Sequence, residues 1–154
     1  MLRSDGGEER KTVTQLERNK TVVRAFIEAI NAKDWSKLDE FVAAGVVRHS
    51  QPSGQPQVRC RDDLKEFLRR EAETFPDAHE RIQFLVAEGD KVAARLAFRG
   101  TQLGPMGPFP ASGNTLSADF TCIFRLAGGR IAEVWAEWDT LNALMQLGHF
   151  RLPA

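Results

Sequence analysis

Hydrophobic residues follow a helical period in the first half of the chain and a strand period in the second half. Apolar side chains recur three or four residues apart in three segments, residues 14–32, 35–42 and 61–74. After Pro76 the period changes to two, so that apolar and polar residues alternate. The pattern therefore predicts helices first and strands afterwards, with one brief strand at residues 45–50 between the second and third helices.

Residues that commonly cap helices mark where the first two helices are expected to begin. Thr14 and Glu17 have the spacing of a capping box, and Asp34 precedes the second apolar segment as an N-cap would. The charged and glycine-containing residues 1–12 come before the first cap, so we expect them to be a disordered leader. Residues 13–150 then form a single domain, since no linker or repeat interrupts them.

Strict alternation predicts two hairpins in the second half. The first has strands at 79–88 and 91–100 joined at Gly89-Asp90, and Ile82, Phe84 and Val86 are expected to share its apolar side. The second begins at Thr115, turns at Gly128-Gly129 and ends near Asp139. A short helix, TLNALMQL, closes the chain.

This order of elements predicts an α+β domain with a curved antiparallel sheet and helices over one face. Long alternating strands wrapped around the long N-terminal helix would make a cone with an apolar interior, and such an interior can hold a ligand. The loop at residues 101–114 is rich in glycine and proline yet carries apolar residues. It is interpreted either as a lid over the interior or as a subunit contact, and both alternatives stay open.

Composition narrows the classes of partner. Twenty-one basic and twenty-one acidic residues cancel, so no net charge favours binding to nucleic acid or to an anionic membrane. No apolar run is long enough for a membrane span, and the polar start lacks the apolar core of a secretory signal, so we expect a cytoplasmic protein. Phosphate-binding loops, metal-ligand clusters and nucleophile elbows are not found in the sequence, which favours a small neutral partner without metal.

The residues around the last strand are the main candidates for chemistry. Asp139 follows Trp135 and Trp138 and precedes the closing helix, so it is either an acid or base at the mouth of an apolar pocket or simply the N-cap of that helix. Alternation groups Asp139 with Trp135, opposite Ala136 and Trp138, and the sequence does not decide which face is the interior. His49 ends the first short strand, where it either reaches the pocket or bonds to loop backbone.

Five segments in order resemble the SnoaL-like polyketide cyclase group of the nuclear-transport-factor-2-like superfamily. They are NKTVVRAFIEAINAKDWSKLDEFVA, VVRHS, TFPDAH, AEGDKVAARLAFRGTQLG and GGRIAEVWAEWDTLNALMQLG, and together they span roughly residues 16–148. The resemblance implies a cone-shaped, cystatin-like α+β barrel, an internal cavity and a homodimer formed through the outer face of the sheet.

The resemblance also implies a chemistry that uses no metal or cofactor. Members of the group close a ring by aldol condensation with a buried acid or base, and the family aspartate maps onto Asp139 and the common histidine onto His49. We therefore expect acid–base chemistry of a cyclase or isomerase on a small apolar compound that carries a carbonyl. The expected pocket walls are Trp35, Phe67, Phe120, Trp135 and Trp138.

Two departures from the family pattern leave other functions open. Val134 stands where relatives often have a histidine, and the chain has no tyrosine to donate a phenol hydrogen bond. A non-catalytic dimeric protein that binds an apolar metabolite, and a hydrolase on the same fold, are therefore the alternatives. The Asp-Arg-Asp chemistry of limonene epoxide hydrolases is disfavoured, because Leu96, Phe98 and Ala136 are expected at the corresponding inward positions.

Overall fold

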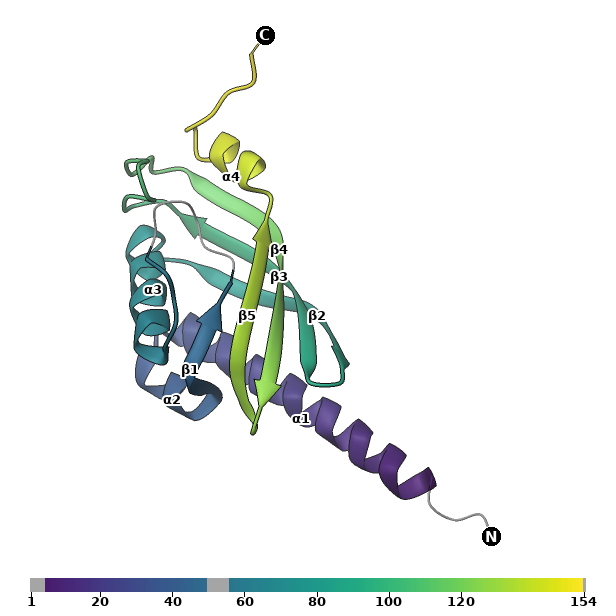
Figure 1. Cartoon of the computed structure of the whole chain (residues 1–154). Helices are drawn as coiled ribbons and strands as arrows, with labels where there is room; N and C mark the ends of the chain where they lie inside the picture. The colour runs from purple at the N-terminus through teal and green to yellow at the C-terminus, as the bar shows by residue number, and fades with distance from the viewer. Residues whose placement is uncertain (1–4, 50–55, 154) are drawn as a thin grey trace.

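A computed structural model of the protein describes residues 5–49 and 56–153. Helices precede the main run of strands, as the change of period after Pro76 predicted (Figure 1). The third helix and the first strand of the first hairpin have the predicted bounds. The elements are α1 (Asp5–Ala32), the 3-10 turn η1 (Trp35–Lys37), α2 (Leu38–Phe41), β1 (Val42–Arg48), α3 (Arg61–Thr74), β2 (His79–Glu88), β3 (Lys91–Thr101), β4 (Thr115–Ala127), β5 (Arg130–Trp138) and α4 (Thr140–Gln146).

The strands form one curved sheet in the order β1-β5-β4-β3-β2. β2 to β5 make the predicted antiparallel meander, and β1 lies parallel to β5 at one edge, which the sequence pattern did not predict. Because β1 and β2 are the two edges and do not pair with each other, the sheet curves without closing into a barrel. The predicted α+β fold, with helices against a curved sheet, is confirmed.

The core lies between the sheet and the helices that cover its concave face (Figure 1). Val23, Phe26 and Ile27 of α1 are almost fully buried, which follows from their helical spacing. Phe26 meets Phe124 of β4 edge to face, with ring centroids 5.7 Å apart and an interplanar angle of 71°. Figure 1 shows α1 running past the sheet, so its C-terminal half carries this contact.

Helix starts agree with the predicted caps at two of three positions. The side chain of Asp34 accepts a hydrogen bond from the backbone N–H of Lys37, and Asp139 caps α4 in the same way. Thr14 does not start α1, because the helix begins at Asp5 and the Thr14 hydroxyl donates to the Arg10 carbonyl at 2.7 Å inside it. The predicted leader, residues 1–12, thus overlaps the start of α1, and residues 1–4 lie outside the described part of the chain.

A β-bulge in β2 reverses which residues face the core. Ile82 pairs with Leu96 and Phe84 pairs with Arg95, so Gln83 is the extra residue. Phe84 and Val86 are each 58% exposed, contrary to the expectation that they share the apolar side with Ile82. Alternation read straight through β2 was wrong beyond the bulge, because one inserted residue moves every later side chain to the other face.

The loop at residues 101–114 is tied down by the amide of Gln102, which is fully buried. Gln102 Nε2 donates to the carbonyls of Gly104 and Pro110, at 3.2 and 3.1 Å, and Oε1 accepts from the Ser112 hydroxyl at 2.8 Å. A ring nitrogen of His149 lies 2.7 Å from the same oxygen. These bonds fix the loop against the C-terminal segment.

Within residues 5–49 and 56–153, no helix is both long and apolar enough to cross a membrane.

Candidate functional site

A cavity of about 120 Å³ lies between the concave face of the sheet and helices α1 and α3. Its wall is mostly apolar, and Trp35, Phe67, Phe120 and Trp138 belong to it, in keeping with four of the five predicted wall residues. Of the residues described, none between 101 and 114 lines it, so the loop does not form a lid in this conformation.

The end of β5 contributes an aromatic stack to the wall. Trp138 lies flat against Phe120 of β4, with centroids 3.9 Å apart and planes 8° apart, and meets Phe98 of β3 edge to face at 5.4 Å. Val134 and Ala136 line the cavity with Trp138. The inner face of β5 is therefore the one with Val134, Ala136 and Trp138, which answers the question that alternation left open.

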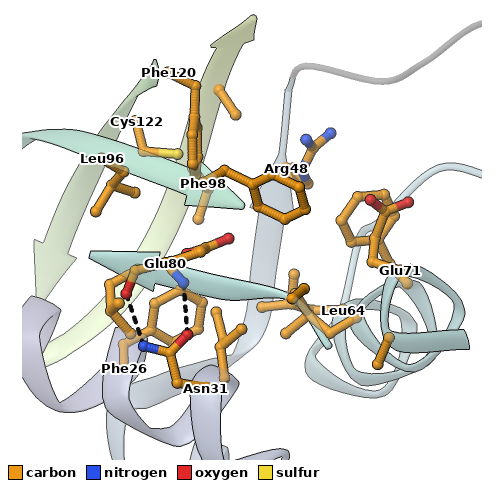
Figure 2. A pocket seen from close by; sticks show the side chains of 18 of the residues that line it. Phe26, Asn31, Arg48, Leu64, Glu71, Glu80, Leu96, Phe98, Phe120 and Cys122 are labelled. Atoms are coloured by element: carbon orange, nitrogen blue, oxygen red, sulfur yellow. Dashed lines mark hydrogen bonds between the residues drawn. The ribbon is translucent and has the colours of Figure 1, made fainter. Parts of the chain in front are cut away.

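Ionisable side chains stand in this apolar wall, and three of them come from three different elements. Figure 2 shows Glu80 of β2, Glu71 of α3 and Arg48 of β1 around the same space. The sequence analysis named none of them as a candidate. Charged groups are rarely placed in such surroundings without a partner or a function, because removal from water costs free energy.

Glu80 is held in place through its backbone by Asn31 near the end of α1. The Asn31 amide donates to the Glu80 carbonyl at 2.8 Å and accepts from the Glu80 N–H at 2.8 Å (Figure 2). These bonds use the free edge of β2, where no further strand pairs. Burial, and to a lesser extent the nearby Glu71 carboxylate, together raise the pKa of Glu80 to about 7.

Glu71 and Arg48 complete the polar part of the wall. Burial raises the pKa of Glu71, and the charge of Arg48 works against that shift. The Arg48 guanidinium lies 4.4 Å from the centroid of Phe67, a cation–π arrangement. Burial lowers the pKa of Arg48, yet a guanidinium stays protonated throughout the accessible pH range.

Cys122 of β4 also lines the cavity, beside the aromatic residues. Burial raises the pKa of its thiol, so Cys122 is a neutral, non-nucleophilic wall residue. In the described residues, no group of three or more His, Cys, Asp or Glu side chains is placed to hold a metal ion.

Asp139 lies beyond the end of β5, outside the residues that line the cavity. One carboxylate oxygen accepts a hydrogen bond from the Asn142 N–H at 3.0 Å, which is the bond of an N-cap. The residue is exposed. Its predicted role as a helix cap is confirmed, and its predicted catalytic role stays a prediction for experiment.

His49 and Trp135 lie together on the outer face of the sheet rather than in the cavity wall. Their rings stack at 4.7 Å with an angle of 13° between planes. A ring nitrogen of His49 is 2.6 Å from Glu133, whose other oxygen accepts from Arg125 at 2.5 Å. The hydrogen bond from His49, and to a lesser extent the one from Arg125, lower the pKa of Glu133. We call Glu133, His49, Arg125 and Trp135 the outer cluster.

The polar wall residues could have been suspected from their positions in the apolar pattern. Glu71 continues the stripe formed by Leu64, Phe67 and Leu68 on α3, since it follows Leu68 by three residues. Arg48 follows buried Val46 by two residues, and Glu80 precedes Ile82 by two. A charged residue at an inward position is the signal that sequence reasoning passed over.

Comparison with known proteins places this geometry in a family. The model of the SnoaL-like polyketide cyclase family matches residues 20–147. None of the curated proteins matches the sequence. Among solved structures, TsrD from Streptomyces laurentii is similar over 87% of this chain and 97% of its own, with 31% identity and a TM-score of 0.77.

Two further structures are similar at lower sequence identity. IdmH, a putative polyketide cyclase from Streptomyces antibioticus, is 28% identical over 84% of this chain and 98% of its own, with a TM-score of 0.72. An epoxide hydrolase of M. tuberculosis that resembles limonene epoxide hydrolase covers 86% of this chain and 91% of its own at 16% identity, with a TM-score of 0.68, so it shares the fold alone. The chain belongs to the SnoaL-like polyketide cyclase family.

Proposed function

We propose that the protein is a small-molecule enzyme that carries out acid–base chemistry on an apolar carbonyl compound inside the cavity. The reaction class is proton transfer next to a carbonyl, as in an aldol-type cyclase or a related isomerase. The observation that carries the proposal is the presence of ionisable side chains, Glu80, Glu71 and Arg48, in the wall of an otherwise apolar cavity. The proposed reaction is proton transfer by side chains and uses no metal or cofactor.

Cavity size limits the proposed substrate. Pockets for drug-sized ligands usually measure about 300–1,000 Å³, whereas an engineered apolar cavity of about 150 Å³ binds benzene. At about 120 Å³, this cavity fits a compound close to the size of one small ring. A larger substrate would extend beyond this volume.

Hydrogen–deuterium exchange of a simple ketone tests the proposal without knowledge of the natural substrate. Cyclohexanone, incubated with the protein in D₂O, is expected to gain deuterium at the carbons next to its carbonyl faster than in buffer alone, as measured by proton NMR. 2-Tetralone, with two rings, is expected to exchange with less enhancement by the protein. Ala136→Leu, which fills part of the cavity, should reduce the exchange of cyclohexanone.

Binding measured in parallel separates the enzyme from the alternative of a binding protein. Trp35 and Trp138 line the cavity, so ligand entry should change tryptophan fluorescence. Binding without exchange would favour the non-catalytic protein. If the ketone neither binds nor exchanges, the proposal of a carbonyl ligand is contradicted.

The predicted pair Asp139 and His49 offers a competing source of the proton transfer. Asp139→Asn keeps a good capping residue, so a loss of exchange in a stable variant would support the aspartate. An unchanged rate would remove Asp139 from the mechanism and leave the carboxyl groups of the cavity wall.

We also propose a homodimer formed through the outer face of the sheet. Phe84, Val86 and Ile123 are 58%, 58% and 39% exposed, and all three are on this face. Exposed apolar residues of this kind are typical of an interface. Sedimentation analysis should give a dimer for the natural protein and a monomer for Ile123→Glu, and a natural protein that sediments as a monomer would contradict the proposal.

A further inference from the structure

We propose that Glu80 is the residue that takes up and returns the proton in the cavity, and that Glu71 sets the pH at which it does so. The inference rests on the proposed function and names its reacting group. It differs from the expectation for Asp139, because Glu80 projects from the first half of the edge strand β2, which β4 and β3 separate from β5.

The position of Glu80 is fixed by two features of the fold. Glu80 precedes the β-bulge and pairs with Phe98, so it shares the inner face with Ile82. The two hydrogen bonds to Asn31 hold its backbone against α1. A reacting group needs a fixed position, and here the strand edge is anchored on both sides.

The surroundings of Glu80 contain few groups that could neutralise it. The apolar side chains that face the cavity from β3 and β5 are Leu96, Phe98, Val134, Ala136 and Trp138. β4 contributes Phe120, Phe124 and the neutral thiol of Cys122. A carboxyl in such surroundings favours its protonated form, and a pKa of about 7 leaves both forms populated at neutral pH.

The other charged groups that line the cavity are in α3, in β1 and just after the end of α1. Glu71 of α3 repels a second negative charge, which is why it raises the pKa of Glu80. Arg48 of β1 carries the positive charge in the wall. Lys33, just after α1, also lines the cavity, but its ammonium group donates to the Pro76 carbonyl.

The proposed step is a reversible enolisation. The Glu80 carboxylate removes a proton from the carbon next to the carbonyl, so a C–H bond breaks and an O–H bond forms on Glu80. The electron pair of the C–H bond becomes the carbon–carbon double bond of an enolate, whose negative charge lies on the former carbonyl oxygen and faces the positive wall provided by Arg48. Protonated Glu80 then returns a proton to carbon, or in D₂O a deuteron after exchange with solvent.

The test compares two carboxyl-to-amide variants on opposite faces of the sheet. Glu80→Gln is expected to lower the protein-catalysed exchange of cyclohexanone at least about a hundredfold, in line with the usual contribution of a general base. Glu133→Gln, the matched control in the outer cluster, should keep the natural rate. Exchange that survives in Glu80→Gln would overturn the inference while leaving the proposed function intact, whereas a natural protein without any exchange would contradict both.

The pH dependence supplies a second readout that a merely structural role would not give. The exchange rate of the natural protein should rise with pH through a midpoint near 7, as the Glu80 carboxylate forms. In Glu71→Gln the midpoint should move to lower pH, because the repelling charge is gone. An unmoved midpoint would overturn the assignment of Glu71.

Direct titration keeps the inference testable even if a variant folds poorly. In natural protein labelled with carbon-13 at the glutamate carboxyls, the resonance of Glu80 should titrate near pH 7. That resonance should be missing in Glu80→Gln. If every glutamate carboxyl of the natural protein titrates between about pH 4 and 5, the inference is overturned.

Discussion

The two faces of the sheet carry clusters made of the same kinds of side chain, and the surroundings give them opposite properties. In the outer cluster, Glu133 accepts hydrogen bonds from His49 and Arg125, which lower its pKa. On the inner face, burial and a second carboxyl raise the pKa of Glu80 to about 7. Both residues are glutamates, so it is access to water and to hydrogen-bond donors that decides which carboxyl can exchange protons near neutral pH.

The two glutamates also differ in what they do in the fold, because Glu133 links strands whereas Glu80 has a pKa near neutral pH. Glu133 remains ionised at neutral pH and links β5 to β4 and to the residue after β1 through Arg125 and His49. Glu80, with a pKa of about 7, gains or loses its proton near physiological pH.

The first prediction compares an apolar residue from each face. Leu96 is fully buried in the cavity wall, so Leu96→Ala should lower the free energy of unfolding by roughly 2–5 kcal/mol. Ile123→Ala on the outer face should lower it by less than about 1 kcal/mol in the monomer, since Ile123 is 39% exposed. Urea unfolding of both variants, at a protein concentration low enough for the chain to be monomeric, measures the difference, and equal losses would contradict the assignment of the faces.

The second prediction concerns Glu80→Gln and its dependence on pH. Because the pKa of Glu80 is raised from 4.5 to about 7, the unfolded chain loses its proton first, and the natural protein becomes less stable as pH rises through this window. The amide has no charge to bury. Glu80→Gln should therefore be more stable than the natural protein at pH 8, by up to roughly 3 kcal/mol, and should lose that advantage near pH 4.

Denaturant melts at pH 4, 6 and 8 measure this effect. A stability difference that does not change between pH 4 and 8 would show that Glu80 does not titrate in this range. The same experiment separates burial of the carboxyl from any effect on turnover.

The third prediction concerns the cap at Asp139. Asp139→Ala removes the hydrogen bond to the Asn142 N–H and should lower the free energy of unfolding by about 1 kcal/mol, whereas Asp139→Asn should change it by a few tenths at most. Thermal melts of both variants measure the effect. Equal melting temperatures for the two would show that the cap contributes nothing to stability.

The smallest effect is expected for Glu133→Gln. Its pKa is lowered, so the carboxylate stabilises the fold above its usual pKa, and this contribution is lost as pH falls through the lowered value. The variant should therefore be slightly less stable at pH 7, with a difference that shrinks in added salt and at low pH. This direction is opposite to that of Glu80→Gln, and the same sign for both would contradict the comparison.

Much of the fold was readable from the sequence because local signals agreed with the tertiary structure. The helical stripe of α3 and the caps at Asp34 and Asp139 each follow from a few neighbouring residues. The parallel pairing of β1 with β5 did not, because it joins Val42 to Ile131 and leaves no periodic trace in either strand. Long-range pairing is decided by packing of the whole domain.

The candidate site was less predictable, for a physical reason. Trp35, Phe67, Phe120 and Trp138 could be expected as walls because large aromatic residues at inward positions pack around the interior. Glu80 stands two residues before Ile82 and shares its face, but charged residues are mostly exposed, so none was expected in the interior. Phe84 and Val86 were misplaced for another reason, because the residue inserted at the bulge shifts the alternation after Ile82.

The bulge at Gln83 has a consequence for how relatives are aligned and redesigned. A homologue that lacks this one residue would keep a single frame along β2, so that either the residue corresponding to Glu80 or those corresponding to Phe84 and Val86 would change face. Two homologous sequences that differ by this single residue could therefore differ in whether a carboxyl side chain faces the interior. Transferring the role proposed for Glu80 to another sheet of this kind would therefore require Gln83 and Asn31 as well as the glutamate.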